Sequence, residues 1–276
     1  MAILTILMPF KDTILKGLGF LIKPFTKGKL IEWQIRVTEL KFDDPVGVED
    51  FTKLYNETFP DDGTNYTAEE LLDAVEDPNN EKKHVQAHNI TLIAYYNNAP
   101  IGFMACYYYP TLEYGIIGYI GRTKEATEKA GEAVRYSTIK LIEKLNSIIH
   151  KKHKCKLLVY ELEIGKRDGE KMQLFKSCAQ KLNLKTYELD FDYWRPKTDL
   201  EDKSEEKLRL VVIPIQTSLH QSMSKNEVLE ILNFLHFYCY GDYYDISDPK
   251  FNVFQDYLKT RMAFYEKNLP DIIKIK

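Results

Sequence analysis

Three apolar runs separated by short turns constrain the fold of this chain more than any other feature. The runs are Thr91 to Tyr96 (TLIAYY), Ile101 to Tyr109 (IGFMACYYY) and Tyr114 to Ile120 (YGIIGYI), and the turn-rich tetrapeptide Asn97 to Pro100 joins the first two. β-Branched and aromatic residues favour extended backbone, and a turn of this length joins antiparallel neighbours. The sequence therefore predicts an antiparallel meander.

Helical periodicity, capping motifs and further apolar runs predict helices and strands on both sides of the meander. In chain order they are a strand at Ile35–Leu40, a helix at Val48–Thr58, a helix after the capping box Thr67–Glu70, a long helix from about Gly131 to Ile149, a strand at Leu157–Leu162, a helix at Glu170–Leu182, strands at Tyr187–Trp194 and Leu208–Ile213, a helix after the capping box Ser224–Glu227, and a helix over Phe251–Tyr265. Helices and mainly antiparallel strands mixed in this way predict an α+β fold.

The charge balance and the cysteines exclude some classes of partner. The chain of 276 residues has 38 basic and 41 acidic side chains and a net charge of −3, whereas proteins that bind nucleic acid usually carry a basic excess. We therefore expect no nucleic-acid partner. The four cysteines lie far apart, without a CxxC pair or the short spacings of metal ligands, so we expect reduced thiols, a cytoplasmic location and no metal: Cys106, Cys155, Cys178 and Cys239.

Residues 1–34 form an apolar, basic N-terminal extension with five lysines against Asp12 and Glu32. Its longest uncharged run, Met1 to Phe10, is shorter than the ~20 apolar residues that a membrane span needs. It also lacks the order of charge, apolar stretch and cleavage site of a secretory signal. The alternatives are an amphipathic helix at a membrane surface, a segment packed on the domain, or a start codon assigned too early; we favour the last two over membrane contact.

A second segment, from Val37 to Glu81, carries fourteen acidic residues against Lys41 and Lys53, a local charge of −12. Two interpretations stay open. The two helices predicted in this segment have ordinary solvated acidic faces, or the carboxylates form an acidic wall that attracts a cationic substrate.

Glycines mark the third strand of the meander and the start of the long helix after it. Gly115, Gly118 and Gly121 lie in or just beyond the strand, and glycine in a strand often marks a bulge or the close approach of a ligand. The helix opens near Gly131, and a helix N-terminus offers unpaired N–H groups and a favourable dipole to an anion. The pattern is typical of a turn that binds a pyrophosphate.

The order of the predicted elements resembles that of the GNAT superfamily of acyl-CoA-dependent N-acyltransferases. Residues 128–133 (EKAGEA) are similar to its R/Q-x-x-G-x-G/A pyrophosphate loop, with Glu128 in the first position. Further matches to a bacterial branch follow in order at Leu54–Pro60 (LYNETFP), Glu161–Glu163 (ELE), Leu174–Lys176 (LFK) and Tyr193–Pro196 (YWRP). The resemblance spans about residues 35–215, which leaves residues 216–276 as a helical C-terminal appendage.

This resemblance implies a mixed, mainly antiparallel sheet flanked by helices, whose fourth strand splays from the fifth to hold the pantetheine arm of acetyl-CoA, the co-substrate. It implies that the coenzyme is bound by Tyr119, Ile120, Gly121, Lys129, Ala130, Gly131, Glu132 and Ala133. Glu113 is the carboxylate nearest the fourth strand and the candidate base, with a solvated strand-entry residue as the alternative. The family's tyrosine acid aligns with Phe175 or Ala179, so Tyr160, Tyr119 or water would have to replace it.

The resemblance implies transfer of an acetyl group from acetyl-CoA to an amine on a small molecule or a protein. The acidic segment predicts a cationic acceptor, bound by Glu57, Asp61, Asp62, Glu69 and Glu70. One alternative, favoured by the missing tyrosine, is a catalytically silent module that binds acyl-CoA or a protein partner. Another is a membrane-surface enzyme for longer acyl chains. The sequence makes no prediction of the acceptor's identity or of the oligomeric state.

Overall fold

The computed structural model describes residues 34–41, 43–59, 67–76, 87–122, 132–164, 168–197, 200, 206–215, 222–241 and 243–276. In chain order the elements are β1 (Ile35–Glu39), α3 (Pro45–Thr58), α4 (Ala68–Glu76), β2 (His88–Tyr96), β3 (Ala99–Tyr109), β4 (Tyr114–Gly121), α6 (Glu132–Lys152), β5 (Leu157–Glu163), α7 (Asp168–Lys181), β6 (Tyr187–Glu188), β7 (Tyr193–Trp194), β8 (Lys207–Pro214), β9 (Ser222–Ser224), α8 (Lys225–Asn233), the π-helix η2 (Phe234–Cys239), α9 (Phe251–Asn268) and β10 (Ile272–Lys274).

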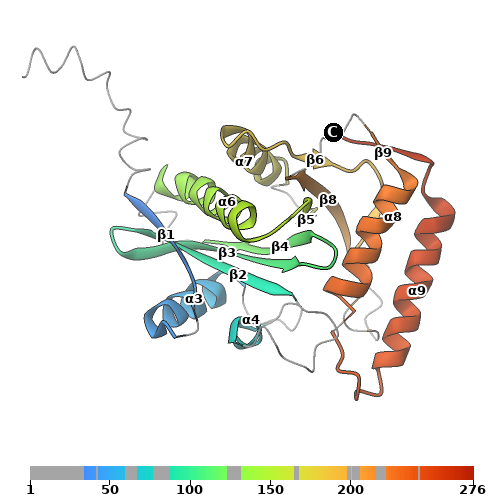
Figure 1. Ribbon diagram of the computed structural model, residues 1–276, viewed down its shortest axis with the longest axis horizontal. Helices are drawn as coiled ribbons and strands as arrows, with labels where there is room; N and C mark the ends of the chain where they lie inside the picture. Colours follow the sequence, from blue (N-terminus) through green and yellow to red (C-terminus); the bar gives the residue numbers. More distant parts are fainter. Residues whose placement is uncertain are drawn as a thin grey trace, which may run out of the picture.

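The main sheet has the strand order β1-β2-β3-β4-β5-β8-β6, with β7 also paired to β8. Strands β4 and β5 are parallel, and the other pairs in this sheet are antiparallel. Helices lie on both sides of it (Figure 1). The predicted α+β architecture, with a mixed, mainly antiparallel sheet flanked by helices, is therefore confirmed.

The predicted meander is formed by β2, β3 and β4. Asn97 and Asn98 both have positive φ, at 50° and 64°. A two-residue hairpin turn of the I′ type requires this backbone, and asparagine adopts it more readily than most residues. The turn is therefore shorter than the predicted tetrapeptide, and Pro100 already lies in β3, opposite Tyr95.

Three apolar clusters hold the helices on the sheet. Helices α6 and α7 cover one face, where Ile142 and Phe175 pack over strands β1 to β5 and β8. The opposite face is divided. Helices α3 and α4 cover its β2–β3 part through Phe51 and Tyr55, whereas the C-terminal elements cover its β4, β5 and β8 part. Tyr107 on β3 packs against both clusters of the divided face and marks their boundary.

The helical C-terminal appendage consists of α8, η2 and α9, which stand together at one end of the sheet (Figure 1). The capping box predicted at Ser224 is confirmed: Ser224 Oγ accepts the N–H of Glu227, and the Glu227 carboxylate accepts the N–H of Ser224. The π-helix and the small antiparallel sheet of β9 and β10 were not predicted from the sequence. Residues 35–215 and 216–276 as separate domains stay a prediction.

The strand predicted over Tyr187–Trp194 is broken into β6 and β7, which corrects the prediction. The reason is a distant segment that pairs with the break: Leu189 bridges to Ile275, and the N–H groups of Glu188 and Lys276 each donate to the other's carbonyl, at 3.1 and 3.0 Å. This pairing covers an edge of the sheet that would otherwise expose unpaired backbone groups.

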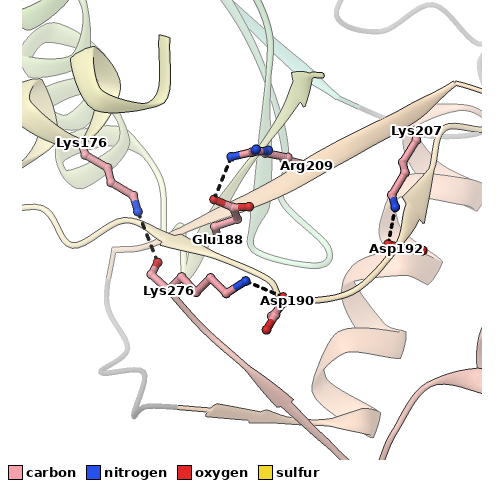
Figure 2. Close-up of polar contacts among 7 residues, drawn as sticks. All are labelled: Lys176, Glu188, Asp190, Asp192, Lys207, Arg209 and Lys276. Atoms are coloured by element: carbon pink, nitrogen blue, oxygen red, sulfur yellow. Dashed lines mark hydrogen bonds and ion pairs between the residues drawn. The ribbon is translucent and has the colours of Figure 1, made fainter. Parts of the chain in front are cut away.

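Charged side chains line the same edge (Figure 2). Lys276 Nζ lies 2.7 Å from Asp190 Oδ1, and Lys176 Nζ donates to the Lys276 carbonyl at 3.5 Å. Beside them, Arg209 pairs with Glu188 at 3.6 Å and Lys207 pairs with Asp192 at 2.5 Å. Because these pairs are partly or largely exposed, each contributes only about 0–1 kcal/mol to stability.

The predicted extension 1–34 falls almost entirely outside the described residues, so its packing and its contact with lipid stay predictions. Among the helices that the structure describes, none combines the length and the apolar run that a membrane crossing needs. All four cysteines lie within the described residues, and none of them forms a disulfide.

Candidate functional site

The parallel ladder between β4 and β5 ends halfway along both strands. It runs from Tyr114 opposite Leu157 to Ile117 opposite Tyr160. Beyond that point β4 stays paired with β3, and β5 stays paired with β8. The second halves of β4 and β5 therefore belong to separate ladders, as the resemblance implies for the fourth and fifth strands.

A bulge in β4 lies at the end of this ladder. Cys106 on β3 pairs with Ile117 and its neighbour Ala105 pairs with Tyr119, so Gly118 has no partner on β3. Gly118 is exposed. A bulge at which the backbone is exposed and carries no side chain allows a ligand to approach the strand closely.

The other two glycines of this strand are explained by packing. A Cβ at Gly115 would lie 2.7 Å from Leu158 Cδ2, and a Cβ at Gly121 would lie 2.1 Å from Phe103 Cε1. Both glycines are buried. A Cβ at Gly118 would lie 3.1 Å from Tyr107 Cε2, a milder conflict. As the exposed one of the three glycines, Gly118 fits best the interpretation as a point of ligand approach.

The residues predicted to bind coenzyme follow the bulge directly. Tyr119 packs edge-on against Tyr55 and Phe59, with ring centroids 5.4 and 5.3 Å away, and Ile120 packs on the cluster under α6. Lys129, Ala130 and Gly131 lie outside the described residues, whereas Glu132 and Ala133 begin α6 and are described by their backbone. The role of these eight residues stays a prediction.

Glu113, the predicted base, lies at the opposite end of β4. It occupies a tight turn with φ of 59°, and its N–H donates to the Tyr109 carbonyl at 2.9 Å. Its carboxylate lies 2.5 Å from Lys156 Nζ, and its carbonyl accepts the Lys156 N–H at 2.7 Å. Five residues of extended strand separate it from Gly118, about 16 Å. The structure does not bring Glu113 together with Tyr119, Ile120 and Gly121.

Substitution of Glu113 by glutamine tests its predicted role. The prediction from the sequence requires a lower acetyl-transfer rate at neutral pH and partial recovery at high pH. The Lys156 ion pair and the distance along β4 instead favour an unchanged rate, with little change in the free energy of unfolding because the pair is largely exposed. A pH–rate profile of the Glu113→Gln variant, set beside its urea denaturation curve, decides between these results.

The predicted acceptor carboxylates lie on α3 and α4. Glu57, Glu69 and Glu70 are exposed, and Asp61 and Asp62 lie outside the described residues. Glu70 also has a structural role, since its carboxylate accepts the Thr67 N–H at 2.7 Å while its own N–H donates to Thr67 Oγ1 at 3.2 Å. The predicted capping box is therefore confirmed, and the binding of an acceptor by these residues stays a prediction.

Sequence reasoning did not identify Glu161 as a candidate catalytic residue. It is the first residue of β5 beyond the ladder with β4. Tyr193 from β7 donates its hydroxyl to Glu161 Oε1, and Tyr240, just after η2, donates to Oε2 at 2.5 Å. A signal was present, because Glu161 is an acidic residue that directly follows the run LLVY and precedes Leu162 in β5.

The environment of Glu161 changes its protonation. The residue as a whole is partly exposed, but its carboxylate is enclosed, and this burial raises its pKa above the ordinary value. Hydrogen bonds from Tyr193 and Tyr240 and the charge of Arg195 act in the opposite direction. The pKa values of both tyrosines are raised well above 10, mainly by burial, so both hydroxyls keep their protons and act as donors.

The two positions that align with the family's tyrosine acid are part of the core. Phe175 and Ala179 are both buried on α7, and the Phe175 ring lies 5.1 Å from the Tyr160 ring. Neither side chain carries a hydroxyl. Neither alignment therefore places a hydroxyl at the position where the resemblance implies the acid.

Comparison with known proteins gives structural similarity alone. No family model and no curated protein matches the chain. A Desulfovibrio desulfuricans protein assigned to the GNAT family is 9% identical with a TM-score of 0.45, and it covers 66% of this chain and 99% of its own. Enterococcus faecium aminoglycoside 6′-N-acetyltransferase is 12% identical with a TM-score of 0.43, and it covers 67% of this chain and 99% of its own. Paenibacillus lautus diaminobutyrate acetyltransferase, in complex with its substrate and coenzyme A, is 12% identical with a TM-score of 0.43, and it covers 67% of this chain and 98% of its own.

The chain itself has β4 parallel to β5, a bulge at Gly118 and a long helix after β4. In the arrangement of its sheet and helices the chain is similar to GNAT acetyltransferases.

Proposed function

We propose that this protein transfers an acetyl group from acetyl-CoA to an amine. The observation that supports this most is the separation of β4 from β5 at the exposed bulge Gly118. A strand edge outside a ladder can pair with the backbone-like groups of an extended ligand. The pantetheine arm of acetyl-CoA is extended and carries two amide groups, which suits this edge.

The residues present also fit the phosphates of the coenzyme. Helix α6 is 21 residues long and begins at Glu132. Its first N–H groups have no partner within the helix, and its dipole favours an anion at that end. The predicted contacts from Lys129 to Ala133 lead into this turn, and Lys129 adds a cation. We assign the thioester end of the coenzyme to the β4 backbone from Gly118 to Gly121.

The reaction makes three chemical demands on the site. The acceptor ammonium must lose a proton, the thioester carbonyl must be polarised, and the leaving thiolate must gain a proton. Backbone N–H groups at the β4 bulge are suited to polarise the carbonyl. With no hydroxyl at Phe175 or Ala179, water supplies the proton for the thiolate in this proposal.

Calorimetry with acetyl-CoA and with CoA tests coenzyme binding. Both are expected to bind the parent protein, and Gly131→Glu is expected to weaken binding by about tenfold or more, since it places a negative charge beside the phosphates. His150→Glu adds the same charge at the other end of α6, where His150 is exposed, and is expected to leave the affinity unchanged. Equal affinity of the two variants for acetyl-CoA would contradict the assignment of the coenzyme phosphates to the N-terminus of α6.

The rival function is a catalytically silent module that binds acyl-CoA or a protein partner. The apolar core positions Phe175 and Ala179, where the resemblance implies a catalytic tyrosine, favour it. Tight acetyl-CoA binding without release of CoA across a broad panel of amines would decide for this module.

The acceptor is proposed to be cationic, because Glu57, Glu69 and Glu70 add negative charge on helices that cover the same face of the sheet as Tyr119. A small molecule and a protein both satisfy this condition. The cytoplasmic location, the membrane-surface enzyme and the role of residues 1–34 stay predictions.

A further inference from the structure

Glu161 lies beside the point where β4 leaves β5. Ile116 pairs with Val159, and both side chains belong to the cluster under the C-terminal appendage. Since strand side chains alternate between faces, Glu161, two residues after Val159, points to this same face. Continued by one residue, the register of the ladder would place Gly118 opposite Glu161. The proposed site of the thioester carbonyl therefore adjoins a carboxylate.

Two hydroxyls from elements distant in the sequence hold this carboxylate. Tyr193 is 32 residues away along the chain and Tyr240 is 79 residues away. Each oxygen of an ionised carboxylate has two lone pairs, and each phenol occupies one of them. Each oxygen of Glu161 therefore keeps one lone pair that neither phenol occupies.

The π-helix of the appendage sets the direction of Tyr240. The Tyr240 N–H donates to the Leu235 carbonyl at 3.0 Å, an i to i−5 bond. The extra residue in this turn rotates the residues after it by about 100° relative to an α-helix. Inserted π turns occur often at functional sites. In this protein the π turn brings a phenol of the appendage to a carboxylate of the main sheet.

A purely structural interpretation makes the carboxylate a latch that docks the appendage. Burial of an ionised group costs free energy, and apolar packing docks an element as well or better. The appendage already has such packing, with Val228, Ile231, Leu232 and Phe234 buried against the sheet. A buried carboxylate is therefore not needed for docking, which favours a chemical role.

We propose that Glu161 accepts the proton of the acceptor ammonium, and that Tyr240 of the C-terminal appendage is the positioning residue that holds the carboxylate for this step. The inference rests on the proposed acetyl transfer. One ammonium proton passes to a Glu161 oxygen, and the free amine attacks the thioester carbonyl carbon. The C–N bond forms, the C–S bond breaks, and a second nitrogen proton reaches the thiolate sulfur through water. Glu161 then returns its proton to solvent.

The charged and titratable groups around Glu161 determine how the rate depends on pH. They are Tyr193 from β7, Tyr240 after η2, Arg195 just after β7 and Glu206 just before β8. The tyrosines remain protonated, and Arg195 is always charged. Burial and the Glu206 charge raise the pKa of Glu161, so the acid limb of the pH–rate profile is expected above the ordinary glutamate range.

Three variants test the assignment through the pH–rate profile. Glu161→Gln is expected to lower the rate at neutral pH by about 100-fold and to remove the acid limb. Tyr240→Phe removes a donor that favours the ionised carboxylate, so its acid limb is expected at higher pH than in the parent. The control is Glu188→Gln on β6, which removes a carboxylate paired with Arg209 and is expected to leave the profile unchanged.

If Glu161 only docks the appendage, these variants would change the melting temperature and leave the acid limb of the pH–rate profile in place, which would overturn the assignment.

Acetyl-CoA calorimetry distinguishes failure of the proposed function from failure of the role assigned to Glu161. A parent protein that does not bind acetyl-CoA contradicts the proposed function. A parent that binds acetyl-CoA and releases CoA, while Glu161→Gln keeps the acid limb, contradicts only the role of Glu161.

Binding of 1,4-diaminobutane, followed by NMR, tests the ammonium site without turnover. The parent is expected to bind this diamine, and Glu161→Gln is expected to bind it at least tenfold more weakly. The Glu188→Gln control is expected to bind it like the parent. Equal affinity of the parent and Glu161→Gln, or no binding by the parent, would overturn the assignment.

Discussion

Replacement of Phe103 by alanine is expected to lower the free energy of unfolding by about 3–5 kcal/mol. Phe103 lies fully buried on β3, beneath α3, and its ring centroid is 5.3 Å from that of Phe51 and 5.8 Å from that of Tyr55. Loss of the ring removes apolar burial and leaves a cavity between α3 and the sheet. Urea denaturation of the parent and the Phe103→Ala variant measures the change.

Gly121 provides a sharper test of the same packing. Its missing Cβ would lie 2.1 Å from Phe103 Cε1, so Gly121→Ala alone is expected to cost about 1–3 kcal/mol. In the Phe103→Ala background the ring is absent, and the added methyl group is expected to cost little. A double-mutant cycle measures this coupling. Additive costs would show that Gly121 is required for a reason other than the Phe103 ring.

Acidification from pH 7 to pH 4 is expected to remove about 3 kcal/mol of stability through His236 alone. His236 is fully buried in η2, and its Nδ1–H donates to the Leu232 carbonyl at 2.8 Å, while Nε2 has no partner among the described residues. Burial lowers its pKa from 6.5 to about 4. The unfolded chain therefore binds the proton first, so the contribution is complete above pH 6.5 and is lost as the pH falls toward 4.

His236→Gln cannot titrate in this range and is expected to lose less stability over the same interval. Urea denaturation of both proteins at several pH values gives the difference. Glu161 acts in the opposite direction, because its raised pKa makes the folded state bind a proton more readily as the pH falls. Glu161 is common to both proteins, so the comparison isolates the histidine. Parallel pH dependences for the two proteins would contradict the prediction.

Local signals made most of the fold predictable. The meander depends on apolar runs and on two asparagines that accept positive φ, and all of these lie within 34 residues of sequence, 88–121. Both capping boxes formed as predicted, because their donors and acceptors are three residues apart. The glycine pattern in β4 was also informative, although one of its three glycines lies at the exposed bulge and the other two serve packing.

Features that depend on distant partners were not predictable in the same way. The break after β6 exists because residues near 275 pair with residues near 189. The partners of Glu161 are equally distant in sequence, and nothing local marks Tyr240 as one of them. Glu113 became the candidate base because it precedes β4 in the sequence. Glu161 is the first residue of the neighbouring strand β5 beyond its ladder with β4, a position that sequence order alone does not reveal.

The short parallel ladder between β4 and β5 has a mechanical consequence. Strands β1 to β4 form one set joined by long antiparallel ladders, and β5, β8, β6 and β7 form another. Four residue pairs connect the two sets within the described sheet, and α6 crosses one face above them. We expect the two sets of strands to separate at this short ladder before either set loses its own pairing. The proposed site thus lies between two more rigid groups of strands, where a small rotation of one group relative to the other changes the distance between coenzyme and acceptor.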